Sequence, residues 1–292
     1  MDRPNDVVDF TPSPEYFPFE SRWFESSVGS LHYIDEGEGR PILFLHGNPD
    51  WSFLYRKLVS ALKGEFRCVA VDYPGFGLSV HPKGYRYTAK EHAGIVGELV
   101  DHLDLQDFIV MGQDWGGPIG MGVASERADR IHGLVMGNTW FWPEGGFMTS
   151  AFSIVMSSFP IQQLIKRRNF FVSPLMKRSL QAKLSDAEFD HYRDVVPTPD
   201  SREGIAVFPR KIRAAKPWLE EVAPRVEANL ADKKVLLTWG MKDPAFGRGP
   251  FLKRWKSTFS DVEVVKMAKA GHYIQEDAPD QIVESIRSRF GG

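Results

Sequence analysis

The chain lacks the features that would tie it to a membrane, to nucleic acid or to an oxidising compartment. Its 292 residues include a single cysteine, which excludes an internal disulfide. The formal net charge of −2 gives no bias toward nucleic acid or acidic membranes. The first residues, MDRPNDVVDF, have no cationic stretch leading into an apolar core. We therefore expect no signal peptide, a cytoplasmic location, and neither nucleic acid nor membrane as a partner.

Long apolar runs and metal-binding patterns are also missing. The most apolar stretch, residues 147–165, is interrupted by serines and Pro160, whereas a spanning helix needs roughly 20 apolar residues. We interpret it as a buried or cleft-lining helix. The eight histidines show no paired ligand spacing, so the sequence predicts neither a metal nor another cofactor. Cys68 lies in the strand-like run FRCVAVD, where a packing role is expected.

The first half of the chain alternates short apolar runs with longer amphipathic ones. RPILFLHG, FRCVAVD, DFIVMG and IHGLVMG are typical of strands, and residues 51–62, 88–103 and 115–126 are typical of helices. Apolar runs without polar alternation suit strands that are covered on both faces. They predict a mostly parallel sheet with crossover helices. SRWFESS and SLHYIDEGEG alternate more and predict an antiparallel hairpin at the sheet edge.

The second half contains an expected helical insertion. Residues 141–217 have no clear strand, and the basic cluster Lys166-Arg167-Arg168 within them is best interpreted as a solvated face. Strand patterns resume in KKVLLTWG and VEVVKMA, followed by a helix expected at 274–289. The prediction is a discontinuous main domain, 1–140 and 218–292, with a helical cap at 141–217. A cap over the carboxyl ends of the strands would close a ligand cleft.

A tight strand-to-helix corner is predicted at Gly112-Gln113-Asp114-Trp115-Gly116. Glycines flank Asp114, as a nucleophile elbow requires, because larger side chains would collide with the strand or the helix. The alternative is an ordinary corner with Asp114 as a helix N-cap. Three further loops favour the elbow: HGNP at 46–49, GFGLS at 75–79 and GHYIQED at 271–277, each directly after a strand-like run. The order nucleophile, acid, histidine is that of α/β-hydrolases.

With these motifs, the chain resembles the haloalkane dehalogenase family of the α/β-hydrolases from about residue 19 to 290. The resemblance implies an α/β-hydrolase fold and hydrolysis of a haloalkane to an alcohol, a halide and a proton. It implies Asp114 as nucleophile and His272 as water-activating base. It also implies that the side-chain N–H groups of Asn48 and Trp115 bind the departing halide.

The acid that orients His272 has two possible positions in the resembling family. The position after the sixth strand holds Asn138, which cannot supply a negative charge. The position after the seventh strand holds Asp243, so we assign the acid there, although Asp243 could also cap the following turn. Glu276 and Asp277 lie too close to His272 in sequence for this geometry, and we expect them to cap the last helix.

Rival functions are an epoxide hydrolase, a fluoroacetate dehalogenase and a non-catalytic binding protein. Epoxide hydrolases use paired cap tyrosines to receive an alkoxide, whereas residues 141–217 contain only Tyr192. The arginine that a fluoroacetate dehalogenase has at the elbow is replaced here by Trp115-Gly116. A binding protein is disfavoured because all three triad positions are occupied by suitable residues.

Several apolar residues of the expected cap are candidates for the substrate pocket, with plain core packing as an equally open alternative. The sequence leaves the preferred halogen, the alkane length and the oligomeric state open. The pocket candidates are Phe141, Trp142, Phe147, Phe152 and Met156.

Overall fold

A computed structural model describes residues 3–143, 146–247 and 250–291, with the side chains of 147–149 outside the description. An eight-stranded sheet forms its centre, in the order β1-β2-β4-β3-β5-β6-β7-β8. Strands β3 to β8 run parallel to one another, whereas β2 pairs antiparallel with β4 and forms the predicted antiparallel hairpin with β1 at the edge. The strands are β1 Arg22–Ser26, β2 Gly29–Glu36, β3 Arg40–Leu45, β4 Phe66–Val71, β5 Phe108–Asp114, β6 Ile131–Thr139, β7 Lys234–Gly240 and β8 Asp261–Met267.

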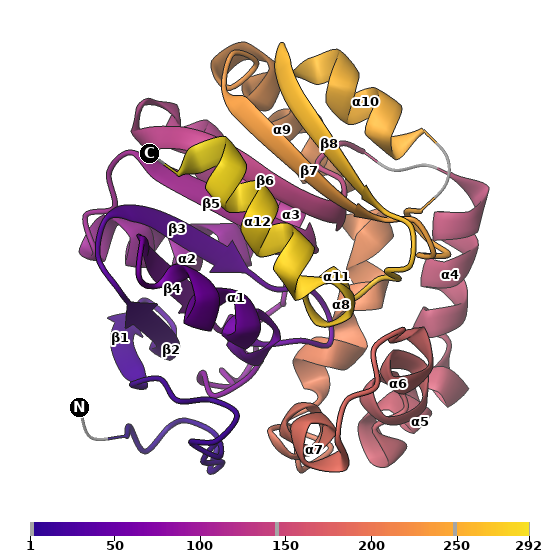
Figure 1. Cartoon of the computed structure of the whole chain (residues 1–292). Coiled ribbons are helices and arrows are strands. Elements are labelled where there is room, and N and C mark those ends of the chain that lie inside the picture. Colours follow the sequence, from indigo (N-terminus) through magenta and orange to yellow (C-terminus); the bar gives the residue numbers. More distant parts are fainter. Residues whose placement is uncertain (1–2, 144–145, 248–249, 292) are drawn as a thin grey trace.

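Helices cover both faces of the sheet. Figure 1 shows α1 and α12 on one face and α2 and α3 on the other, and α3 also packs against α9. The helices are α1 Arg56–Leu62, α2 Ala89–His102, α3 Gly116–Glu126, α4 Phe147–Ser157, α5 Phe159–Arg168, α6 Lys177–Ser179, α7 Asp186–Asp194, α8 Glu203–Ala214, α9 Lys216–Asn229, α10 Phe251–Thr258, α11 Ile274–Asp277 and α12 Pro279–Phe290, with short turns at Ser52–Tyr55, Ala128–Arg130 and Phe171–Met176.

The central strands lie in the buried middle of the sheet because their sequences are uninterrupted apolar runs. Ile42, Leu43, Phe44 and Leu45 of β3 are completely buried, and so are the apolar residues of β5. Burial on both faces is what a parallel sheet with crossover helices requires. The fold is therefore the predicted α/β-hydrolase fold.

Helices α4 to α8 lie between β6 and β7 in the chain and gather at one end of the sheet (Figure 1). We call residues 147–214 the helical insert. A buried ionic cluster joins it to the rest of the protein: Glu276 accepts bonds from Arg56, from Lys57 at 2.8 Å, and from the hydroxyl of Tyr192 in α7. The expectation that Glu276 caps the last helix was therefore wrong.

Asp277 also differs from its predicted role. Its carboxylate accepts bonds from the backbone N–H groups of Gly271 at 2.7 Å and of Gln181 and Ala182 at 2.8 Å. It thereby ties the loop after α6 to the loop that carries His272. The predicted last helix is broken at Ala278, where α11 ends and α12 begins with Pro279, because proline favours the first turn of a helix.

The apolar stretch at 147–165 is two helices separated at Ser158. No helix in the described part of the chain is long and apolar enough to cross a membrane. The prediction of a buried or cleft-lining helix was wrong for one face of this stretch, because apolar side chains there are exposed. The basic cluster behaves as predicted at Arg167 and Arg168, which are exposed, while Lys166 pairs with Glu203. The exposed apolar residues are Phe152, Ile154, Val155, Phe159 and Leu164.

The contact between the start of α3 and the end of β3 predicts that alanine substitutions at two glycines have opposite effects on stability. A methyl group on Gly116 would lie 1.9 Å from the carbonyl oxygen of Leu45, whereas one on Gly94 in α2 would meet nothing within 4 Å. Gly116→Ala should lower the free energy of unfolding by about 3 kcal/mol or more, the upper end of overpacking costs. Gly94→Ala should raise it by about 0.5–1 kcal/mol. Urea unfolding measures both, and an unchanged Gly116→Ala would contradict the packing of α3 on β3.

Candidate active site

The strand-to-helix corner at Asp114 is the geometric centre of the site. Asp114 ends β5 with a φ of +50°, in the left-handed region, and α3 begins at Gly116. A methyl group on Gly112 would lie 2.5 Å from the carbonyl oxygen of Gly116, and one on Gly117 would lie 1.8 Å from the hydroxyl of Thr139. That hydroxyl donates to the carbonyl of Asp114 at 2.5 Å. The corner therefore requires glycine at these positions, as an elbow does.

The carboxylate of Asp114 is held by the loop after β3. The backbone N–H of Asn48 donates to its Oδ2 at 3.0 Å, and a methyl group on Gly47 would lie 2.6 Å from its Cβ. Burial raises the pKa of Asp114, while the charge of His272 and the backbone N–H groups of Asn48 and Trp115 act to lower it. These donors partly replace water around a carboxylate that is otherwise poorly solvated.

His272 and Asp243 form the predicted pair. The Nδ1 of His272 lies 2.7 Å from Oδ2 of Asp243, a distance that fits an N–H donated to the carboxylate. The other oxygen of Asp243 accepts bonds from the backbone N–H groups of Ala245 at 2.7 Å and Phe246 at 3.2 Å. Burial acts to raise the pKa of Asp243, but the charge of His272 and these bonds lower it overall. Asp243 thus bonds to the histidine and also caps its own turn.

Asn138 supports the acid from the neighbouring strand. Its amide donates to Oδ2 of Asp243 at 2.8 Å and to the carbonyl of Gly240 at 3.0 Å, and its Oδ1 accepts from the N–H of Gly240 at 2.7 Å. The φ of Asn138 is +41°, a region that asparagine tolerates better than most residues. No role was predicted for Asn138 from the sequence, although an asparagine at a strand end was a signal for such a turn.

The protonation of His272 depends on the carboxylates around it. Burial acts to lower its pKa, but Asp243, and then Asp114 and Asp50, raise it to about 9. Gln113, directly before Asp114, donates from its amide to the carbonyl of His272 at 3.0 Å, and the same nitrogen lies 3.1 Å from Nε2 of the ring. Gln113 was missed in the sequence because nothing marked it beyond its place in the elbow.

Asn48 and Trp115 are both buried, and both contact helix α8 of the insert. The side-chain amide of Asn48 donates to the carbonyl of Ile205 at 3.3 Å. The indole of Trp115 stacks on Phe208 with ring centres 4.9 Å apart. The insert therefore positions the two residues that were predicted to bind halide.

An aromatic layer extends from Trp115 to His272. Trp140 meets Trp115 edge-on at 5.1 Å and stacks on Phe246 at 5.6 Å, and Phe246 faces the ring of His272 at 6.0 Å. These aromatic groups shield the site from water on that side. Trp140, Phe208 and Phe246 were not among the predicted pocket residues.

The predicted pocket residues lie in several different environments. Phe141 and Trp142 pack against Trp255 and Phe251 of α10, which favours the alternative of plain core packing. Phe152 is 43% exposed on the outside of α4, and this contradicts its assignment to the pocket. Met156 is buried. The side chain of Phe147 lies outside the described residues.

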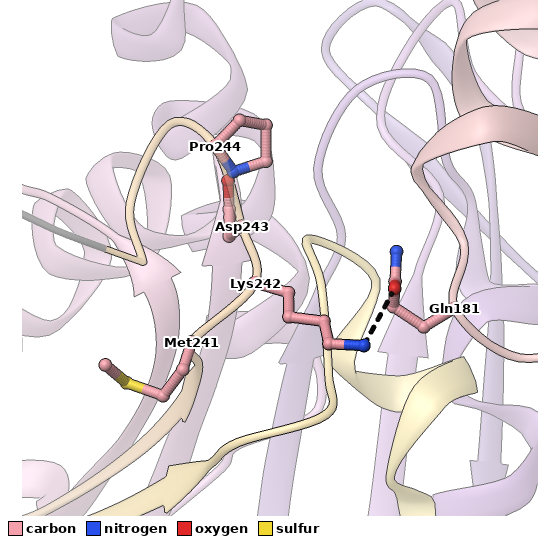
Figure 2. Close-up of a pocket in the computed structure, with 5 residues that line it drawn as sticks. All are labelled: Gln181, Met241, Lys242, Asp243 and Pro244. Atoms are coloured by element: carbon pink, nitrogen blue, oxygen red, sulfur yellow. Dashed lines mark hydrogen bonds between the residues drawn. The ribbon is translucent and has the colours of Figure 1, made fainter.

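An open pocket of about 500 Å³ lies beside Asp243 rather than over Asp114. Figure 2 shows its lining by Gln181, Met241, Lys242, Asp243 and Pro244, with Lys242 reaching Gln181. Asp114 is not among the residues that line this pocket. Among the described residues, no group of three or more His, Cys, Asp or Glu is placed to hold a metal ion.

Comparisons with known proteins agree with this geometry. A family model described as alpha/beta hydrolase fold matches residues 40–279. Haloalkane dehalogenase 2 of Mycobacterium tuberculosis is 54% identical over 97% of this chain and 99% of its own length. A cis-3-alkyl-4-alkyloxetan-2-one decarboxylase of Shewanella oneidensis is 32% identical over 92% of this chain and 88% of its own.

Solved structures with a similar fold include haloalkane dehalogenases. The crystal structure of a putative ancestral haloalkane dehalogenase has a TM-score of 0.80 at 26% identity, covering 91% of this chain and 97% of its own. The haloalkane dehalogenase DatA of Agrobacterium tumefaciens has a TM-score of 0.84, covering 95% and 98%. Its 24% identity supports the fold alone. From the family model and the 54% identity over nearly the full length, this chain belongs to the haloalkane dehalogenase family of α/β-hydrolases.

Proposed function

We propose that this enzyme converts a haloalkane and water into an alcohol, a halide ion and a proton through an ester on Asp114. The observation that carries the proposal is the carboxylate at the elbow, held by the N–H of Asn48 at 3.0 Å and electrostatically coupled to the His272–Asp243 pair. We further propose that the protein acts in the cytoplasm, without a cofactor, and that residues 147–214 belong to a cap domain that closes the site.

In the first step, the carboxylate of Asp114 attacks the saturated carbon that carries the halogen. A carboxylate needs no base to activate it, since its ordinary pKa is about 3.9. The carbon–oxygen bond forms as the carbon–halogen bond breaks, and the electron pair leaves with the halide. Because a halide is a weak base, it requires N–H donors rather than a proton. The indole of Trp115 and the amide of Asn48 are suited to this role.

In the second step, His272 takes a proton from water, and the water oxygen attacks the ester carbonyl. The charge on Asp114 controls this step. In the free enzyme the pKa of His272 is about 9, so the ring keeps its proton at neutral pH and loses it only above that value. Asp114 is one of the groups that raises this pKa. Ester formation removes its negative charge, so the pKa of His272 falls, the ring releases its proton to solvent, and it can then act as a base.

The catalytic roles predict different defects for two alanine variants. Wild-type enzyme should release bromide from short bromoalkanes, and Asp114→Ala should release none. In His272→Ala the first step should proceed and the second should slow by about 10²–10⁴-fold, the usual contribution of a general base. Mass spectrometry of His272→Ala should then show one added alkyl group. His132→Ala is the matched control, since His132 pairs with Asp107 away from the site. Turnover by Asp114→Ala would contradict the covalent route.

The charge coupling predicts a shift in the titration of His272. Replacing Asp114 by alanine removes a negative charge beside the ring, as esterification does. The pKa of His272 in Asp114→Ala should therefore lie below the wild-type value of about 9. Nuclear magnetic resonance of labelled histidine measures both titrations. An equal or higher pKa in the variant would contradict the proposed switch.

A second candidate reaction is the loss of carbon dioxide from a cis-3,4-dialkyloxetan-2-one. The relative that is 32% identical over 92% of this chain carries that activity in its name. Opening such a ring also expels a weakly basic anion, a carboxylate, which fits the same N–H donors. The net reaction consumes no water, whereas dehalogenation does. A panel containing both substrate classes separates the two, by bromide release on one side and alkene formation on the other.

A further inference from the structure

Asp50 is a buried acid with no assigned role. It lies two residues after Asn48 in the loop that holds the nucleophile, and its backbone N–H donates to the carbonyl of Gly47 at 3.2 Å. The residue is 1% exposed, and neither carboxyl oxygen has a hydrogen-bond partner in the described part of the protein. An unpaired buried polar group is costly, so such a group in a native fold calls for a partner.

The surroundings of Asp50 place it at the catalytic centre. Burial raises its pKa to about 8, opposed by the charge of His272 and assisted by those of Asp114 and Glu276. Three buried tyrosines also lie within electrostatic range of Asp50. Burial is the largest cause of the raised pKa of each, and the charge of Asp50 raises it further. The three are Tyr55, Tyr192 and Tyr273. At neutral pH Asp50 is therefore mostly a neutral carboxylic acid, which has both an O–H donor and a carbonyl acceptor.

Gln275 is a second unpaired polar group in the same place. It is fully buried, and neither amide atom forms a hydrogen bond of normal geometry among the described residues, although the side chain lies against the hydroxyl of Tyr55. Burial raises the pKa of Tyr55, Gln275 acts to lower it and Asp50 acts to raise it, so both side chains lie near that hydroxyl. The hydroxyl itself donates to the carbonyl of Leu45 at 2.8 Å. The unpaired acid and this amide thus both lie near the hydroxyl of Tyr55, and Asp50 also lies within electrostatic range of His272.

We propose that Asp50 and Gln275 bind the hydrolytic water and present it to His272 for attack on the Asp114 ester. This inference rests on the proposed function. A neutral acid and an amide each offer a donor and an acceptor, and water is a small molecule that satisfies both. Keeping Asp50 uncharged also serves the base, because an ionised Asp50 raises the pKa of His272 and holds its proton in place.

The chemical step balances without any change in Asp50. The water oxygen bonds to the ester carbonyl carbon while one water proton moves to His272. Collapse of the intermediate breaks the bond to the alkoxy oxygen, which leaves as the alcohol with the proton from His272. Asp114 retains the water oxygen together with the second proton, and this proton is released to solvent.

The test separates the two steps in Asp50→Leu, which keeps the approximate shape of the side chain but removes both hydrogen-bonding atoms. With enzyme in excess over a bromoalkane, bromide release in the first turnover should stay near the wild-type rate. Decay of the alkyl ester, followed by mass spectrometry, should slow at least about tenfold, a small part of what general-base catalysis contributes. Asp50→Asn, which mimics the neutral acid, should restore most of that loss. Asp232→Leu, at an exposed acid, is the control.

The pH dependence and a second variant complete the test. Ester decay in wild type should fall as pH rises through about 8, where Asp50 ionises, and this limb should be absent in Asp50→Asn. Gln275→Leu should slow ester decay without slowing bromide release, and it decides the matter if Asp50→Leu does not fold. Wild-type ester decay in the leucine variants, or the same alkaline limb in Asp50→Asn, would overturn the proposal. Absence of any ester in His272→Ala would instead overturn the proposed function.

Discussion

The site depends on one constraint: a buried carboxylate is held at a tight corner, where backbone N–H groups and the charge of one histidine stabilise it. Gly112, Gly116 and Gly117 bring β5, β3 and α3 together, because a methyl group at any of them would collide with a neighbouring group. The same close approach brings the N–H of Asn48 within 3.0 Å of Asp114. The carboxylate is thereby partly desolvated but still supplied with donors. This state favours attack on saturated carbon, since little water must be removed first.

The charges around this corner form a coupled set. Asp243 and Asp114 both raise the pKa of His272, and His272 in turn opposes the rise in the pKa of Asp114. In the proposed mechanism the enzyme changes this balance itself, because ester formation neutralises Asp114. A neutral Asp50 contributes no further negative charge, so the fall in the pKa of His272 is larger than it would be beside an ionised acid. Helix α8 connects the insert to this site, because it contacts Asn48 and Trp115.

The sheet, the edge hairpin and the elbow could be predicted because each leaves a local pattern: apolar runs, alternation and paired glycines. The bond between Asp243 and His272 was expected from the resemblance to the family, which offers a position for the acid after the seventh strand. Contacts between distant segments left no such pattern. Asn138 bonds to a carboxylate 105 residues away, and Glu276 joins α1 to α7. The apolar composition of residues 141–156 could not identify the aromatic residues beside the site. It did not reveal that Phe141 faces α10 whereas Trp140 faces Trp115.

The most direct test of the account is a single turnover in ¹⁸O-labelled water with enzyme in excess over substrate. If the halogen is displaced by Asp114 and water then attacks the ester carbonyl, the alcohol takes its oxygen from the carboxylate. The account predicts labelled oxygen in the peptide that contains Asp114 and unlabelled alcohol. Labelled alcohol with an unlabelled peptide would mean that water displaces the halogen itself, and would contradict the central claim.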